Sequence, residues 1–429
     1  MHFRLLLPAV GLLLAPPVSA SDFSLNSAAL ADLQTAGAPA ASSPSPARDW
    51  TVMVFVNGKN NLESSALMDV NQMELVGATG KVGVVVEMGR MNGQSEGDDH
   101  SEGDWTGVRR YLVTRDADTA RINSPVLEDL GKADMGSWKE LAAFVLWAKA
   151  NYPARRYALA MWDHGNGWKP LDPANAPDFY HVKGFSLDEE TGREISVPQL
   201  AAALKAAGGV NFLMLDGCNM QMASVAYELK DYAETLTASE ESEPGVVLRY
   251  AQVLQQLNAR PGMDAAGLAA AAVRIYRDYF VNTAGDNEGV PLTQSALRLA
   301  KMAPLRARLD AWAAAALRAE PQVLLAAKKN AKIFGEDPEF KDLYDFVELV
   351  TAGTAQPGLK ARGREVMEFI KTELLIENWA QDAASHGLSI YVPDAYDPLY
   401  DGLAWAKDGS WDEFAKFMAA IKGPAPARP

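Results

Sequence analysis

The hydrophobic pattern of the chain alternates, from about Trp50 onward, between short apolar runs and longer segments with helical spacing. The apolar runs predict strands and the longer segments predict helices. Nearly continuous apolar strands that alternate with helices are typical of a mostly parallel sheet with helices on both faces. The predicted strands are 51–56, 82–88, 157–162, 211–215 and 235–238, and the predicted helices are 61–76, 137–151 (opened by a capping box at Ser137 and Glu140), 196–207 and 220–232.

The pattern changes after Pro244, where helical spacing dominates. We expect an α/β catalytic core over 49–245 and a largely helical C-terminal region over 246–421 that returns one strand to the core, with a flexible tail over 422–429. The predicted elements of the C-terminal region are helices over 265–282, 292–317, 340–350, 359–376 and 411–421, and one strand over 388–393.

The N-terminus has the pattern of an export signal. Arg4 precedes an apolar run from Leu5 to Leu14, and small residues follow at 18–20. The run is too short to span a bilayer, so we interpret residues 1–20 as a signal peptide and the Ala, Ser and Pro-rich residues 21–48 as a linker. The expected protein is exported, either periplasmic or extracellular, and has no membrane span.

Composition narrows the possible functions. The chain of 429 residues has a formal net charge of −15, which argues against non-specific nucleic-acid binding and suits basic substrates. Its single cysteine, Cys218, cannot form an internal disulfide or a thiolate zinc cluster, so it is either a buried small residue or a reactive thiol. No motif requires a cofactor. The acidic segment 97–104 could bind calcium, although it lacks the spacing of an EF-hand, and a solvated loop is the alternative.

Two predicted strands end in polar residues that could carry chemistry. His164 follows the strand 157–162, and Cys218 follows the strand 211–215, 54 positions later. Ligands bind at the carboxyl ends of strands in such sheets, and a histidine about 50 residues before a cysteine is the order found in caspases. A thiolate attacks a carbonyl carbon, and an imidazole exchanges the protons. The backbone N–H groups of Gly165 and Cys218 could form an oxyanion hole.

The residues themselves leave alternatives open. His164 can also be a loop histidine bonded to the backbone, and His100, His181 and His386 compete for the role of base. Asp216 is expected to point in the same direction as Cys218, because alternate strand residues share a face. It could therefore line a substrate pocket, or it could cap the helix that follows.

Seven segments of the chain carry a common family pattern, namely 50–74, 105–113, 162–168, 215–229, 238–245, 341–349 and 386–393. In these segments the chain resembles the clostripain-like cysteine peptidases. The resemblance implies a caspase-like fold and a dyad of Cys218 and His164. It also implies cleavage after Arg or Lys, with Asp216 at the bottom of the specificity pocket. Two departures are Gly217, where the family often has Ala, and residues 246–249, where it often has Gly and an aromatic residue.

We therefore predict an exported cysteine endopeptidase, a thiol protease that hydrolyses peptides or proteins after basic residues. Asp216 is the expected substrate-binding residue, and Glu240 and Glu241, with Glu243 near them, are expected to add negative charge to the pocket. Two other classes stay open, namely an inactive binding protein of the same fold and a thiol transpeptidase.

Overall fold

The first described element of the chain is strand β1 (Arg48–Gly58). The structure, a computed structural model, describes residues 48–93, 97–169, 184–244, 250–283, 291–335 and 337–421. The predicted signal peptide, the linker up to residue 47 and the tail lie outside these residues. None of the helices in the described ranges has the length and apolarity that a membrane crossing requires.

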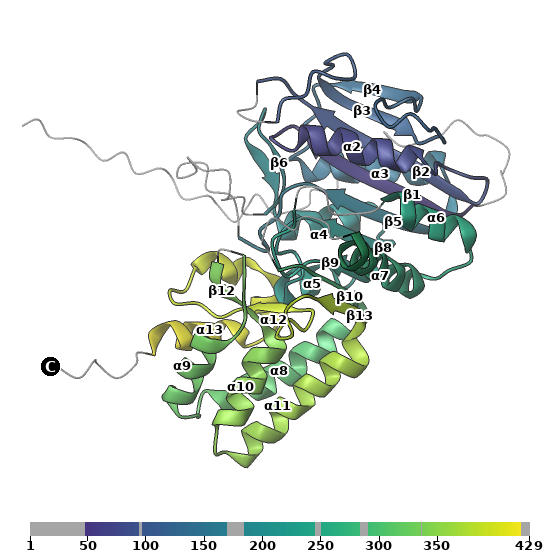
Figure 1. Cartoon of the computed structure of the whole chain (residues 1–429). Coiled ribbons are helices and arrows are strands. Elements are labelled where there is room, and N and C mark those ends of the chain that lie inside the picture. The colour runs from purple at the N-terminus through teal and green to yellow at the C-terminus, as the bar shows by residue number, and fades with distance from the viewer. Residues whose placement is uncertain are drawn as a thin grey trace, which may run out of the picture.

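A nine-stranded sheet forms the centre of the molecule (Figure 1), in the order β13-β10-β9-β8-β5-β1-β2-β3-β4. The five strands from β9 to β2 run parallel, and antiparallel strands extend the sheet at both edges. The predicted α/β class is confirmed. Beside β1, the strands are β2 (Val82–Arg90), β3 (Gly107–Leu112), β4 (Val126–Gly131), β5 (Ala154–Trp162), β8 (Val210–Asp216), β9 (Ala233–Ala238), β10 (Thr293–Arg298) and β13 (Leu375–Ala380).

Side-chain alternation along the parallel strands builds one apolar core on each face of the sheet. Met53 and Phe55 of β1 pack on one face with helices α3, α4 and α5, whereas Val52 and Val54 pack on the other with α2, α6 and α7. Both faces are thus covered, which explains why the strands are almost entirely apolar. The helices are α2 (Glu63–Glu74), α3 (Trp138–Asn151), α4 (Val197–Ala206), α5 (Ala223–Leu229), α6 (Tyr250–Ala259) and α7 (Ala265–Thr283).

A helical lobe follows β10 and occupies the lower part of Figure 1. The buried Trp312 lies at its centre, with ring centroids 5.4 Å from Phe414 and 5.9 Å from Phe346. A three-stranded sheet lies beside these helices. The elements are α8 (Met302–Ala316), α9 (Pro321–Asn330), α10 (Leu343–Gly353), α11 (Pro357–Phe369), α12 (Ala404–Asp408), α13 (Trp411–Ala420), β11 (Ile333–Phe334), β12 (Asp337–Asp342) and β14 (Ser389–Tyr391).

The strands that the C-terminal region adds to the central sheet are not the one predicted from the sequence. The predicted strand 388–393 forms β14, which pairs with β12 and not with the central sheet. Instead β10 and β13 join the central sheet. β10 lies within the predicted helix 292–317, whereas only the first two residues of β13, 375 and 376, overlap the predicted helix 359–376. Each strand directly adjoins a helical segment, so its apolar residues merge into the helical period. Pairing with β9 decides the conformation of β10, because only tertiary contacts supply those hydrogen bonds.

The starts of two predicted helices agree with the structure only in part. Ser137 is the N-cap of α3, as predicted, but its side chain makes no capping bond, so the capping box is absent, and Glu140 lies 3.5 Å from Arg110 instead. The helix predicted from residue 220 starts only at Ala223, because the N–H groups of Asn219 and Gln221 bond to the backbone of residues 239–241. The chain after Cys218 is therefore extended alongside that loop.

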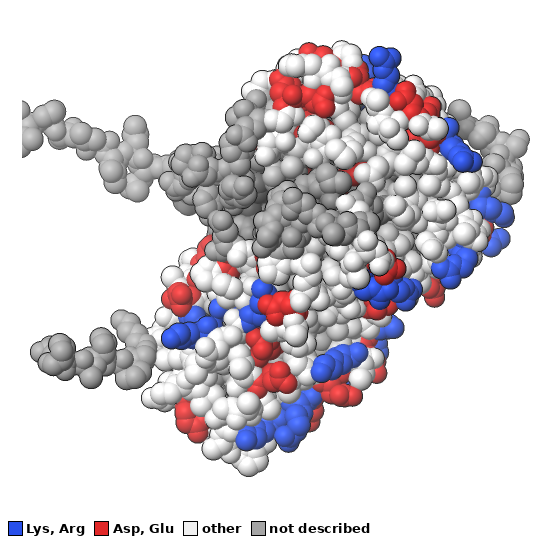
Figure 2. Space-filling view, in the orientation of Figure 1, with Lys and Arg blue, Asp and Glu red and all other residues white. Residues whose placement is uncertain are grey.

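Charged side chains of both signs share the visible surface (Figure 2). Acidic groups gather at the end that carries β3 and β4, with lysines and arginines among them, and both signs alternate over the helical lobe. Among the described residues visible in this view, basic side chains are interspersed with acidic ones, which does not favour non-specific phosphate binding there.

A buried ion pair anchors the start of α2. Glu63 and Arg90 are both fully buried, and Glu63 Oε1 lies 2.5 Å from Arg90 Nε. We expect Glu63→Ala to lower the free energy of unfolding by about 3–5 kcal/mol, because it leaves a buried guanidinium without its counter-charge. Urea denaturation measures this. Asp278→Ala, which breaks an exposed pair with Arg277, should change it by less than about 1 kcal/mol; equal effects would contradict the prediction.

Candidate active site

The register between β5 and β8 brings the two chemically important loops together. Trp162 is paired with Asp216, so His164 and Cys218 each lie two residues beyond the same pair. The N–H of Asp163 donates to the carbonyl of Asp216 at 3.3 Å, and this contact continues the pairing into the loops. A Cβ on Gly165 would lie 2.8 Å from the carbonyl oxygen of Cys218. The two loops are therefore in direct backbone contact.

His164 is held in a neutral state by its surroundings. Its Nε2 lies 2.7 Å from Asn61 Oδ1, and its backbone N–H donates to Asp163 Oδ1 at 2.6 Å. Because the amide oxygen only accepts, the ring proton resides on Nε2 and Nδ1 is the basic nitrogen. Burial lowers the pKa of His164 to about 4. The imidazole is thus uncharged at neutral pH and able to accept a proton.

Cys218 is partly exposed, and its sulfur contacts the loop that follows β9. The N–H of Glu243 donates to Sγ at 3.2 Å. Burial raises the pKa of the Cys218 thiol to about 12, and this outweighs the opposite effect of that N–H. No hydrogen bond among the described residues joins the thiol to the imidazole of His164. In this conformation both groups of the predicted dyad are neutral.

A buried polar network supports the loop of His164. Asp163 accepts hydrogen bonds from Asn57 Nδ2 at 3.0 Å and from Asn60 Nδ2 at 2.7 Å. The two asparagines lie at and just beyond the carboxyl end of β1, which pairs with β5. Our sequence reasoning assigned them no role. The sequence does contain a pattern that could have indicated a role, because three asparagines lie within residues 57–61 at the end of a buried strand.

Asp216 is buried beside a second acidic residue, Glu243. Its Oδ2 accepts a hydrogen bond of 2.8 Å from the phenol of Tyr250. Burial raises the pKa of Asp216 to about 7, and burial together with the charge of Asp216 raises the pKa of Glu243. Gln294 Nε2 lies 3.3 Å from Glu243 Oε1. Met222 is the N-cap of α5, so Asp216 does not cap that helix.

Glu240 and Glu241 have different surroundings from those predicted. Glu240 Oε2 accepts from the N–H of Gly387 at 2.9 Å, and Glu241 Oε1 accepts from that of Gly335 at 2.5 Å. Both carboxylates therefore join their loop to the helical lobe. Glu243, three residues beyond Glu240, is the acidic residue that lies beside Asp216. An irregular loop has no regular alternation of side chains, so the sequence could not predict in which direction each of these carboxylates points.

The competing histidines have other partners. His386 Nδ1 lies 3.2 Å from Asp342 Oδ1, and its ring stacks on Tyr344 with centroids 4.3 Å apart. His100 is exposed and pairs with Asp104 at 3.3 Å. His181 lies outside the described residues.

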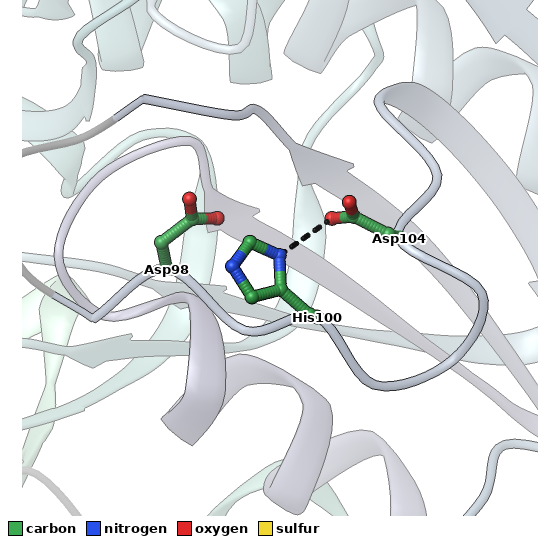
Figure 3. A group of neighbouring side chains, drawn as sticks. All are labelled: Asp98, His100 and Asp104. Carbon is green, nitrogen blue, oxygen red and sulfur yellow. Dashed lines mark ion pairs between the residues drawn. The ribbon is translucent and has the colours of Figure 1, made fainter.

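The acidic loop brings Asp98, His100 and Asp104 together at the surface (Figure 3). One ligand atom from each lies within 4.8 Å of the others. Calcium takes six to eight oxygen ligands, so a set of two carboxylates and an imidazole does not fit it. Calcium binding therefore stays a prediction, and these three side chains alone do not make up its site.

The central strands of the sheet are parallel, and a histidine and a cysteine follow two neighbouring strands. This arrangement is typical of the caspase-like cysteine peptidases. The chain belongs to the clostripain family, which it matches over residues 54–357. The resemblance noted from the sequence is thereby confirmed.

Known relatives agree with this assignment. Clostripain from Hathewaya histolytica is 24% identical over 230 residues, which make up 50% of this chain and 43% of clostripain, so the chain spans less than half of that relative. An inactive zymogen C11 protease from Parabacteroides distasonis has a TM-score of 0.63 at 18% identity. A secreted C11 cysteine protease from Bacteroides thetaiotaomicron, in complex with an irreversible peptide inhibitor, has a TM-score of 0.62 at 18% identity. Each alignment covers 86% of this chain and 99% of the solved chain, and shows the shared fold.

The contact between the two loops predicts a sharp requirement for glycine at position 165. In Gly165→Ala the new Cβ would approach the Cys218 carbonyl at 2.8 Å and Met220 Cγ at 2.9 Å. We expect a loss of about 1–3 kcal/mol in the free energy of unfolding, as for other overpacked sites. Gly80→Ala, where a Cβ would meet nothing within 4 Å, is the control. Equal stability of the two variants would refute the close packing of the loops.

Proposed function

We propose that this protein is a cysteine endopeptidase in which Cys218 is the nucleophile and His164 the general base and acid. The observation that carries the proposal is the in-phase pairing of β5 and β8, which delivers both residues to one edge of the sheet. Membership of the clostripain family supports the same chemistry.

The mechanism follows from the groups present. Nδ1 of His164 takes the thiol proton, and Sγ attacks the carbonyl carbon of the substrate. The imidazolium then gives its proton to the leaving amine, and water hydrolyses the thioester. For the attack, the sulfur must exchange its contact with the Glu243 N–H for one with His164. Pairing with the imidazole would lower the high pKa of the thiol.

The N–H groups of Gly165 and Cys218 are suitable donors for the oxyanion. Gly165 and Phe185 form an isolated antiparallel β-bridge. The hydrogen bond of this bridge runs from the N–H of Asn166 to the carbonyl oxygen of Gly184. The N–H of Gly165 therefore takes no part in that pairing. Among the described residues, neither Gly165 nor Cys218 donates its N–H to a carbonyl. Two N–H groups that no described carbonyl engages would suit a tetrahedral intermediate at this place.

We further propose that the pocket of Asp216 and Glu243 receives Arg or Lys of a peptide or protein substrate. Without a bound substrate, these two neighbouring buried acids carry little negative charge, because burial and their mutual repulsion both favour the neutral forms. A cationic side chain would bring both pKa values down and form a desolvated ion pair. The N-terminal signal pattern, and the secretion of one structural relative, support export.

The dyad is tested by replacing its members. Cys218→Ala should abolish hydrolysis of fluorogenic peptides with Arg before the cut, and His164→Ala should lower kcat by about 10²–10⁴-fold, as is usual for loss of a general base. His100→Ala, at an exposed site, should retain wild-type activity. Full activity of Cys218→Ala would disprove the nucleophile. A wild-type protein that neither cleaves the peptides nor reacts with a peptidyl thiol probe would favour an inactive binding protein, and transfer to an added amine would favour a transpeptidase.

The pocket predicts a pH dependence that is specific to cationic substrates. Asp216 has a pKa near 7, so kcat/KM for Arg peptides should rise as the pH increases through about 7 and its carboxylate ionises. Asp216→Asn should lower this kcat/KM by about 100-fold, in line with the loss of one partner of a buried charge pair. Alkylation of Cys218 by iodoacetamide should change little in the same variant. A preference for acidic or apolar residues before the cut would refute the pocket, and the dyad could still stand.

A further inference from the structure

We infer that Asn61 is a positioning residue for His164, and that its amide oxygen fixes the ring tautomer in which Nδ1 faces the reacting thiol. The observation is the contact of 2.7 Å between Asn61 Oδ1 and His164 Nε2. The inference rests on the proposed role of His164 as the base. Asn61 itself touches neither Cys218 nor the acidic pocket among the described contacts, so it acts only through the histidine.

The backbone of Asn61 is held from two sides. On one side, the neighbouring Asn60 donates to Asp163 Oδ1 at 2.7 Å and accepts from the N–H of Leu62 at 2.9 Å. On the other side, Gly97 packs on the carbonyl of Asn61 so closely that a Cβ on Gly97 would lie 2.1 Å from it. A backbone fixed in this way places the Cα–Cβ bond of Asn61, and the contact with His164 Nε2 sets the direction of the carboxamide, as a positioning role requires.

The loop that contains Gly97 is itself anchored in the protein interior. Glu63 Oε2 accepts from the N–H of Asp99 at 3.0 Å, and the other oxygen of Glu63 binds the buried Arg90. Arg90 also donates to the carbonyl oxygens of Asp99 and Ser101. The buried ion pair thus stabilises the support of Asn61 as well as the start of α2.

An ordinary structural role does not account for the Asn61 side chain. The N-cap of α2 is Leu62, which makes no side-chain cap, so the carboxamide of Asn61 is not needed to start that helix. Asp163 lies next to His164 in sequence, yet its carboxylate binds the backbone N–H of His164 and not the ring. The described hydrogen-bond partner of the ring is therefore a neutral amide.

A neutral acceptor has a definite chemical consequence. A carboxylate at this position would stabilise the imidazolium and raise the pKa of His164, as in the aspartate-containing triads. The amide orients the ring without that charge, and burial keeps the imidazole neutral. The base is thus ready to accept a proton over a wide pH range.

The first test compares Asn61→Ala, Asn61→Asp and the control Asn151→Ala in the full chain. Asn151 is exposed, and its side chain bonds only to its own helix, at Trp147 O. We expect Asn61→Ala to lower kcat by about 100-fold with little change in KM, because a misplaced base costs about that factor. Asn61→Asp should recover most of this loss, and its acid limb of kcat/KM should move to higher pH. Wild-type kcat in Asn61→Ala would overturn the inference.

The second test measures the tautomer of the His164 ring directly and does not depend on catalytic activity. Nitrogen NMR of ¹⁵N-histidine-labelled protein, with His164 assigned from the spectrum of His164→Ala, should show the proton on Nε2 in the wild type and a mixture of tautomers in Asn61→Ala. An unchanged tautomer would overturn the inference. If Asn61→Ala does not fold, the pH shift of the isosteric Asn61→Asp decides, and no shift counts against Asn61. Activity in Cys218→Ala would instead refute the proposed function, while the tautomer result would stand by itself.

Discussion

The hydrogen-bond register of β5 against β8 is the constraint on which the candidate site depends. The strands are parallel and end together at Trp162 and Asp216, so equal steps into the two loops reach His164 and Cys218. A slip of one residue would turn every side chain of the strand to the opposite face and expose its apolar set. The two apolar cores therefore fix the register, and the register fixes which residues meet at the sheet edge.

Burial determines the charge state of this edge. The imidazole, the thiol and the pocket acids all lie where solvation of an ion is poor, so each favours its neutral form. These side chains become charged only when an oppositely charged group nearby stabilises the ion. In the proposed function, a cationic substrate side chain beside Asp216 and Glu243 is one such partner, and the approach of His164 to the sulfur is another. The proposal thereby links substrate binding and chemistry through one electrostatic environment.

The loop after β9 connects this edge to the helical lobe. Its residue Glu240 bonds to Gly387 and its residue Glu241 to Gly335, both in the C-terminal half of the chain. Its residue Glu243 contacts the sulfur of Cys218 through the backbone. The helical lobe thus holds the segment that contacts the Cys218 sulfur, and a movement of this loop would change the surroundings of the thiol and of Asp216 together.

The sequence by itself determined the parallel core, because the apolar runs of β1, β2, β5 and β8 are local patterns set by burial on both faces. It also pointed to His164 and Cys218, since polar residues directly after such strands must reach the sheet edge. Only the tertiary structure decided that β10 and β13 are strands, that Glu243 and not Glu240 or Glu241 lies beside Asp216, and that Tyr250 and Asn61 contact the site. These features depend on contacts between segments far apart in sequence or on irregular loops, where no hydrophobic period records the direction of a side chain.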